Sequence, residues 1–381
     1  MGNGSLFFIM KQFKLLKERA GKWRQRYVDA DTGRFFFRRD VPQRYPFNGL
    51  HLLSVANESQ LCKMLDVTLK AMSEFIHHPS YTTFEISKKK GGKRTIEAPD
   101  EDLKEVQRRL NYYLNAYYLM IKPASVFGFV IQPKENGRYC AIAENARPHV
   151  GKKQVLNIDI KDFFPAIKAG RVKALFTSEI FGYNEHLATL LALLVTHKGA
   201  LPVGAPTSPA IANFICYPLD MELMQFCSDH GLTYTRYADD LTFSAEETID
   251  TDDILDIVSI INSHHFAINE KKFRIRSAHQ QQMVTGVVVN RKVNIDRKLI
   301  RRVRAILHDI QLNGLIAATM RHFRIDEMPD DAAISYFSRR TVGLVNFIGQ
   351  VKGPKDPVYL RYKRILDDLF PSYVSSPKTY F

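Results

Sequence analysis

Aspartates are the residues with the clearest chemical potential in this 381-residue chain. Asp239 and Asp240 are adjacent, and strand-favouring runs flank them, so we expect the pair at the tip of a β-hairpin. Adjacent carboxylates raise each other's pKa, so a fold gains little from them unless a cation lies nearby. Nucleotidyl transfer uses two divalent ions about 3.5–4 Å apart, one at the attacking hydroxyl and one at the leaving pyrophosphate. An isolated Asp-Asp pair, however, is more often a solvated turn.

A third aspartate, Asp159, stands 80 residues before Asp239. Leu156, Ile158 and Ile160 alternate with polar residues around it, which is the period of a half-buried strand. We therefore expect Asp159 on the polar face of that strand. Three carboxylates with substrate phosphates suit Mg²⁺, a hard cation that prefers oxygen ligands. Two Mg²⁺ ions are the expected cofactors, with Mn²⁺ as a substitute.

The elements that must position these aspartates follow an α+β order. Helical periodicity is predicted for residues 11–27, 59–77, 101–121, 168–180, 187–195, 208–228 and 254–264, and almost throughout after 296. Strands are predicted at 82–86, 95–98, 154–160, 273–276 and 284–289, with a hairpin over 233–244. A change to basic, helical sequence near residue 291 indicates a domain boundary.

The charge of the chain favours a polyanionic partner. Lys and Arg number 54 against 40 Asp and Glu, and residues 1–50 alone hold eleven against four, interleaved with aromatic rings that can stack on bases. The alternative is a basic helix that packs on its own domain. No apolar run approaches the roughly 18–20 residues of a membrane span, and the four cysteines form no C-x-x-C pair. We therefore expect a cytoplasmic protein with free thiols and no membrane partner.

These blocks together resemble the reverse transcriptase family. Tyr-Ala-Asp-Asp at 237–240 is similar to its catalytic hairpin, residues 159–164 to the strand with the third metal ligand, and Pro-Val-Gly-Ala-Pro at 202–206 to its glycine-rich turn. The resemblance implies a right-hand polymerase. A basic, aromatic extension (1–50) would precede the fingers (51–150). The palm (151–290) would hold a small antiparallel sheet, helices and the catalytic site, and a helical thumb with a C-terminal tail (291–381) would follow.

The resemblance also implies the roles of individual residues. Asp159, Asp239 and Asp240 would be the catalytic acids and metal ligands, joined by the backbone carbonyl of Ile160. Arg94 would hold the triphosphate of the nucleotide. Lys93 and a lysine among residues 88–90 would assist it.

Three further residues would contact the incoming nucleotide. Phe164 falls where the family carries an aromatic gate against a ribose 2′-hydroxyl, and Val203 and Gly204 would line the pocket. The family usually has glutamine at the position of Val203. Because the valine side chain makes no hydrogen bond, we expect weaker nucleotide positioning.

Two motifs resemble those of bacterial retron reverse transcriptases. They are Asn-Ala-x-x-His at 145–149 and Val-Thr-Gly at 284–286. Residues 291–304 hold seven Lys or Arg and one acid, which in a thumb would contact duplex phosphates without reading sequence. The expected RNA contacts are Asn145, His149, Val284, Thr285, Gly286, Arg297, Lys298, Arg301 and Arg302.

Retron membership implies a specific activity and specific partners. Such an enzyme binds a structured non-coding RNA and polymerises deoxynucleoside triphosphates from the 2′-hydroxyl of a guanosine in it. The product, msDNA, is a branched RNA–DNA hybrid that works in antiphage defence with a toxic effector, in some cases in a higher-order assembly. Two alternatives stay open: a group II intron-like or diversity-generating reverse transcriptase, and an RNA-binding scaffold that restrains an effector.

Overall fold

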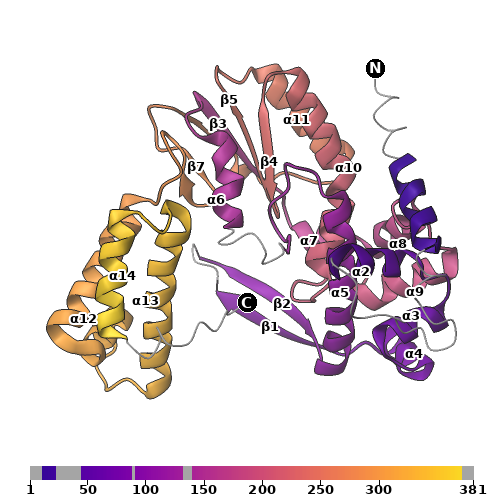
Figure 1. Cartoon of the computed structure of the whole chain (residues 1–381), viewed down its shortest axis with the longest axis horizontal. Helices are drawn as coiled ribbons and strands as arrows, with labels where there is room; N and C mark the ends of the chain where they lie inside the picture. Colours follow the sequence, from indigo (N-terminus) through magenta and orange to yellow (C-terminus); the bar gives the residue numbers. More distant parts are fainter. Residues whose placement is uncertain (1–10, 23–43, 88–90, 132–139, 371–381) are drawn as a thin grey trace.

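The computed structural model describes residues 11–22, 44–87, 91–131 and 140–370. Runs of helices are interspersed with a few short strands, so the predicted mixture of helices with a small antiparallel sheet is confirmed. In Figure 1 three long helices at the C-terminal end stand beside the rest of the chain, and the β1–β2 hairpin projects between the two parts.

The first part of the chain is a helical layer with one hairpin. Residues 11–22 form a helix that buries Phe13 and Leu16 against the core, with the Phe13 ring at the edge of Tyr217. Helix starts follow their caps: the Asp100 side chain accepts from the N–H of Leu103 where α5 begins. The elements are α2 (Arg44–Leu53), α3 (Glu58–Leu65), α4 (Leu69–His77), β1 (Tyr81–Ser87), β2 (Lys93–Pro99) and α5 (Glu101–Ile121).

The central part contains a four-stranded sheet in the order β4-β5-β3-β6, with every neighbouring pair antiparallel. α10 and α11 cover one face, and α6 lies on the other (Figure 1). The elements are α6 (Ala141–Ala146), η2 (Arg147–His149), β3 (Gln154–Asp159), α7 (Phe163–Ala166), α8 (Ala169–Thr177), α9 (Glu185–Val195), α10 (Ser208–Asp229), β4 (Thr233–Tyr237), β5 (Asp240–Ala245), α11 (Thr251–Ser263), η3 (Glu270–Lys272) and β6 (Arg274–Ser277).

The C-terminal part is a three-helix bundle preceded by a short hairpin. Its longest helix is interrupted at Gly314, whose φ of 77° is not helical. The elements are β7 (Met283–Val284), β8 (Val287–Val288), α12 (Arg297–Phe323), α13 (Asp331–Lys352) and α14 (Pro357–Leu369).

Two apolar clusters divide the described residues. One joins the N-terminal helices to the sheet and α7–α11. The other joins the bundle to the β7–β8 hairpin and to Ala146 and Val155. Burial of these apolar surfaces is the main stabilising term for both clusters. The bundle therefore has a core of its own, although the predicted limits at 50, 150 and 290 stay predictions.

Three predicted elements differ from the structure. The single helix over 59–77 is two helices, because Asp66 ends α3 with a left-handed φ of 56° and Thr68 caps α4. The strand over 284–289 is instead a hairpin, β7–β8, since Thr285 and Gly286 both have positive φ and form a turn. Of the helix predicted over 11–27, residues 11–22 are helical, and the remainder lies outside the described residues.

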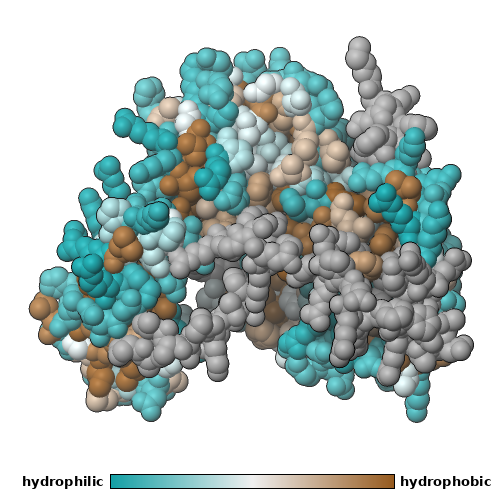
Figure 2. Space-filling model, in the orientation of Figure 1, coloured by the Kyte–Doolittle hydropathy of each residue, from teal (hydrophilic) through white to brown (hydrophobic). Residues whose placement is uncertain are grey.

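The surface is mainly hydrophilic. On the face in Figure 2, teal residues cover most of the bundle and of the region above the sheet, with hydrophobic patches between them. Within the described ranges, no helix has both the length and the apolar character needed to cross a membrane. The four cysteines are unpaired, as predicted.

Candidate active site

The Asp-Asp pair lies at the turn between β4 and β5, as predicted. Tyr237 pairs with Asp240, so Ala238 and Asp239 form the connection. Ala238 has a φ of 59°, in the left-handed region that costs an L-residue about 1–2 kcal/mol. A Cβ on Gly128 would come within 2.1 Å of the Ala238 nitrogen, so another segment packs tightly against the turn.

The third aspartate comes to the same place through β3. In the antiparallel pairing of β3 with β5, Asp159 lies opposite Asp240. The next residue, Ile160, donates its N–H to the Asp239 carbonyl at 2.9 Å. The carboxylate of Asp159 therefore meets the adjacent pair Asp239 and Asp240, 80 residues later in the chain, at one end of the sheet.

Two residues near η3 hold Asp159, and neither was expected from the sequence. Lys272 donates to Asp159 Oδ1 at 2.5 Å, and Asn269 donates to Oδ2 at 3.2 Å. The Asn269 N–H also donates to the Asp159 carbonyl at 2.7 Å. Because these residues follow Asp159 by 113 and 110 positions, no spacing pattern links them to it.

The electrostatics of the cluster are those of crowded negative charge. Desolvation and then the charge of Asp159 raise the pKa of Asp239. Asp240 is exposed on its outer side, but desolvation by the surrounding protein and then the charges of Asp239 and Asp159 raise its pKa to about 6. Desolvation opposes the upward shift of the Lys272 pKa, but its hydrogen bond to Asp159 and the attraction of the three carboxylates outweigh it. The acids therefore favour a cation beside them.

The donor set matches the chemistry of a magnesium site. Carboxylate oxygens are the ligands that Mg²⁺ prefers, and three of them lie together here. In the structure, however, Lys272 and Asn269 occupy both carboxylate oxygens of Asp159. Among the described residues, no three His, Cys, Asp or Glu side chains are arranged so that they could hold a metal ion as they stand. A metal ion bound to Asp159 would thus replace the Lys272 contact.

The β1–β2 hairpin directs one basic residue toward these acids. The charge of Arg94 lowers the pKa of Asp239, against the larger effect of desolvation. Lys93 pairs instead with Glu85 at 2.6 Å across the hairpin. Neighbouring strand residues point to opposite faces, so Lys93 and Arg94 lie on different sides of the hairpin. The expected nucleotide contact by Lys93 stays a prediction. The lysines at 88–90 lie outside the described residues.

The glycine-rich turn packs on the same hairpin. The Val203 carbonyl accepts from the N–H of Glu97 at 2.8 Å, and the Val203 side chain is half-buried. Gly204 has a φ of 132°, and a Cβ there would lie 2.8 Å from Cγ2 of Ile96. The glycine is therefore required for the close approach of β2, and its expected place in the nucleotide pocket stays a prediction.

Phe164 lies in α7, five positions after Asp159, and is half-buried. Its ring centroid is 5.8 Å from that of Phe129 and 5.4 Å from that of Phe163. These rings fix the orientation of Phe164 near the acids. Its role as a gate against a ribose hydroxyl stays a prediction.

The Asn-Ala-x-x-His motif is internal, which corrects the expected RNA contacts of Asn145 and His149. Both side chains are fully buried. His149 is hydrogen-bonded to Ser244 Oγ at 2.7 Å and Thr235 Oγ1 at 2.8 Å, and desolvation and then the charge of Lys152 lower its pKa to about 3. A neutral imidazole with both nitrogens engaged joins η2 to the sheet, so we assign it a packing role.

The Val-Thr-Gly motif forms the turn of the β7–β8 hairpin. Val284 is fully buried, which also corrects its expected contact with RNA. Thr285 and Gly286 form the turn, with φ of 46° and 83°, and Gly286 is exposed. Asn145 Nδ2 donates to Thr285 Oγ1 at 3.5 Å, so the two motifs, 140 residues apart, contact each other.

The basic residues predicted at the start of α12 are on the surface. All four are exposed, and none forms an ion pair with another described residue. They follow the i, i+4 spacing of one helix side. They are Arg297, Lys298, Arg301 and Arg302.

Comparisons with known proteins agree with this architecture. Residues 86–289, more than half of the chain, match the family model "Reverse transcriptase (RNA-dependent DNA polymerase)". The retron Ec86 reverse transcriptase of Escherichia coli is 38% identical over 237 residues, covering 60% of this chain and 70% of the relative. The retron Mx65 reverse transcriptase of Myxococcus xanthus is 34% identical over 276 residues, covering 66% of this chain and 62% of the relative, which is less than two thirds of its length.

A solved structure of telomerase from Candida albicans superposes with a TM-score of 0.43 at 9% identity, over 80% of this chain and 66% of that one. That score is too low to establish a common fold. The family match and the sequence relatives carry the assignment: the chain belongs to the retron reverse transcriptases, within the family of RNA-dependent DNA polymerases.

Proposed function

We propose that this protein synthesises DNA on an RNA template with a two-metal site built from Asp159, Asp239 and Asp240. The observation that carries the proposal is the β3–β5 register, which sets Asp159 opposite Asp240 beside the Asp239 turn. A chain gains nothing structural from three carboxylates gathered at one place, two of them with raised pKa values, whereas divalent ions would be stabilised by them.

Asp159 and Asp239 would bridge two Mg²⁺ ions, with Mn²⁺ as a substitute, and Asp240 and the Ile160 carbonyl would complete the ligand set. The ions would activate the primer hydroxyl and stabilise the leaving pyrophosphate. Arg94 is the basic group that would orient the triphosphate, since its charge already acts on Asp239.

The remaining parts would act as fingers, palm and thumb. The β1–β2 hairpin would close over the nucleotide from the fingers, with Phe164 excluding a ribose 2′-hydroxyl. The exposed basic side of α12 would hold duplex phosphates, because Lys and Arg contacts to phosphate bind without reading sequence.

As a retron-type enzyme, the protein would bind a cognate structured non-coding RNA and start DNA synthesis from an RNA 2′-hydroxyl. The product would be a branched RNA–DNA hybrid used in antiphage defence with an effector. Family membership supports this, and so does the contact between Asn145 and Thr285, which joins two retron-type motifs across the chain.

Nucleic acid that copurifies with the protein provides the test. After expression with its neighbouring RNA locus, the bound material should be shortened both by ribonuclease and by deoxyribonuclease, and debranching should separate the two parts. Asp159→Asn should keep the RNA and lose the DNA. DNA-free RNA on the wild-type protein would overturn the polymerase proposal and favour an RNA-binding scaffold.

A further inference from the structure

A buried arginine lies two residues before the catalytic turn. Arg236 of β4 has no exposed surface, and it pairs with Asp220 of α10, which is also fully buried. Its Nε donates to Asp220 Oδ1 at 2.7 Å and its Nη2 to Oδ2 at 2.6 Å. This planar, two-bond pairing fixes the guanidinium in one orientation.

The remaining nitrogen of Arg236 reaches the turn itself. Nη1 donates to the Ala238 carbonyl at 3.1 Å and to Asn213 Oδ1 at 3.1 Å. Asn213 in turn donates to the Gly128 carbonyl at 3.1 Å, and Gly128 is the residue packed against the Ala238 nitrogen. The left-handed Ala238 is thus held at its carbonyl by Arg236 and at its nitrogen by the segment that Asn213 anchors.

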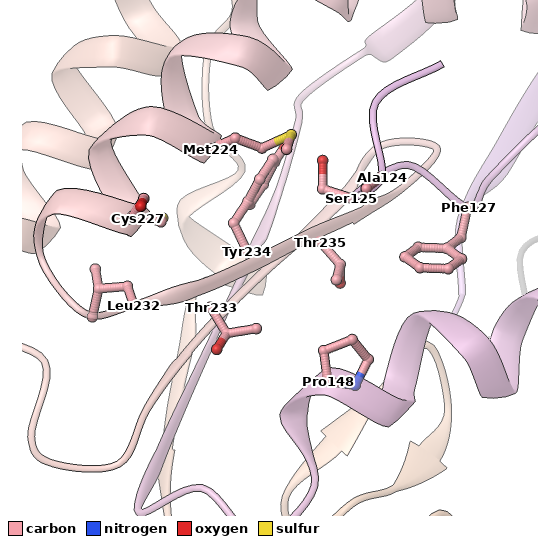
Figure 3. Close-up of a pocket in the computed structure, with 11 residues that line it drawn as sticks. Ala124, Ser125, Phe127, Pro148, Met224, Cys227, Leu232, Thr233, Tyr234 and Thr235 are labelled. Atoms are coloured by element: carbon pink, nitrogen blue, oxygen red, sulfur yellow. The ribbon is translucent and has the colours of Figure 1, made fainter. Parts of the chain in front are cut away.

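The sheet alone does not hold the turn this way. β4 is an edge strand of its sheet. On its outer side the Arg236 N–H donates to the Ser125 carbonyl, and the Arg236 carbonyl accepts from the N–H of Phe127. Next to that point, Thr233 and Thr235 line a cavity of about 410 Å³, which Figure 3 shows between β4, Phe127 and Pro148.

A buried ion pair is also weak evidence for a stabilising role. Taking both charges out of water costs several kcal/mol each, and apolar replacement of such a pair is often neutral or stabilising (about 1–4 kcal/mol). A buried pair whose free nitrogen ends on the one strained residue of the turn therefore has another use.

We propose that Arg236 is a positioning residue, which, with Asp220 and Asn213, holds the Ala238–Asp239 turn in the shape that presents Asp239 and Asp240 to the metal ions. The proposal rests on the proposed polymerase function. It predicts that metal affinity and turnover depend on this network more than folding does.

Three variants separate positioning from stability. The triple variant Arg236→Met, Asp220→Leu, Tyr234→Phe removes both charges and the tyrosine hydroxyl that donates to Asp220 at 2.8 Å. Tyr234→Phe alone is the matched control, because that hydroxyl does not touch the turn. Gly128→Ala leaves the network intact and presses on the turn from the opposite side.

Four quantities would be measured on the full chain: the melting temperature, kcat and KM on a primed RNA template, the Mg²⁺ concentration for half-maximal rate, and Mn²⁺ affinity by electron paramagnetic resonance. For the triple variant and Gly128→Ala we expect kcat to fall about 10- to 100-fold, since misplacement by about 1 Å can have that effect. The Mg²⁺ requirement should rise and Mn²⁺ affinity fall several-fold, with KM for the nucleotide nearly unchanged. The control should match the wild type.

A folded triple variant with wild-type kcat and Mn²⁺ affinity would overturn the proposal. So would failure of both the triple variant and Gly128→Ala to fold, which would make the network purely structural. If the wild type makes no DNA, the polymerase proposal fails, and Mn²⁺ affinity then tests the role of Arg236 separately. Lowered affinity in the triple variant would support the positioning role, and unchanged affinity would overturn it.

Discussion

Two hairpins of this protein contain a non-glycine residue with left-handed backbone, and they use it differently. In the catalytic hairpin (β4–β5) the residue is Ala238, with φ of 59°, and in the Val-Thr-Gly hairpin (β7–β8) it is Thr285, with φ of 46°. The first turn presents Asp239 and is held by a buried arginine. The second is held by one long hydrogen bond from Asn145, at 3.5 Å.

The comparison shows what backbone strain needs in order to persist. A left-handed L-residue survives only where its surroundings impose it, and such sites concentrate at functional positions. Charged and buried support surrounds Ala238, whereas Thr285 stands at an exposed turn whose flanking valines pack into the core of the bundle. We infer that the first turn must be rigid for chemistry and that the second mainly joins α6 to the bundle.

The largest predicted effect is the loss of a carboxylate from the catalytic hairpin. Asp239→Asn should lower magnesium-dependent DNA synthesis on an RNA template by about three orders of magnitude, since a lost metal ligand removes several kcal/mol of transition-state stabilisation. Primer extension under single-turnover conditions measures this. Asp256→Asn, an exposed aspartate on α11, is the matched control and should be fully active. Substantial synthesis by the Asp239 variant would refute the site.

A smaller effect concerns stability and its dependence on pH. The pKa of Asp240 is about 6, above its ordinary 3.8, so the folded state binds more protons between about pH 4 and 6 and loses stability as pH rises through that window. Asp240→Asn should therefore raise the melting temperature above pH 6 in the absence of divalent ions. The difference should vanish near pH 4.

The effect of Mg²⁺ on the melting temperature of the same two proteins is the second part of this experiment. Because a ligand that binds only the folded state stabilises it, Mg²⁺ should raise the melting temperature of the wild type more than that of Asp240→Asn. Thermal melts with and without the ion, at pH 4 and pH 8, measure both effects. A variant less stable than the wild type at pH 8 without metal would contradict the electrostatic account.

The smallest effect lies in the Val-Thr-Gly hairpin. Thr285→Gly relieves about 1–2 kcal/mol of left-handed strain against a glycine entropy cost of roughly 0.5–1 kcal/mol. The backbone change alone should therefore raise the free energy of unfolding by up to about 1.5 kcal/mol, and loss of the long hydrogen bond from Asn145 reduces that gain, with activity unchanged. Ala238→Gly is the matched change in the catalytic hairpin, where the looser turn should lower activity. Chemical denaturation and primer extension on both variants decide whether the two turns differ in function as proposed.

The sequence was most informative where chemistry has a short motif. Strand alternation around Asp159 and the strand-favouring runs around the paired aspartates at 239–240 sufficed to predict the strand and the hairpin, because both are local patterns. That the two meet was implied only by the resemblance to the reverse transcriptase family, since pairing between strands so far apart in sequence has no local signal. The sequence could not show that Lys272 reaches Asp159, since that contact depends on how η3 returns to the sheet.

Burial of polar residues was the other limit. His149 and Arg236 are polar side chains in segments that resemble functional motifs. A single sequence does not show whether such a side chain is exposed and binds a ligand or is buried and hydrogen-bonded inside the protein. Arg236 offered one clue: a cation on the inward side of a strand between Thr235 and Tyr237. The structure was needed to find its partner Asp220.

The most direct test of the central claim is a structure determined with Mn²⁺, a primed template and an incoming nucleotide, using anomalous scattering to locate the metal. Two manganese peaks should lie between the carboxylates of Asp159 and Asp239, with Lys272 displaced from Asp159. Peaks remote from these residues, or an Asp159 still paired with Lys272 and free of metal, would contradict the account.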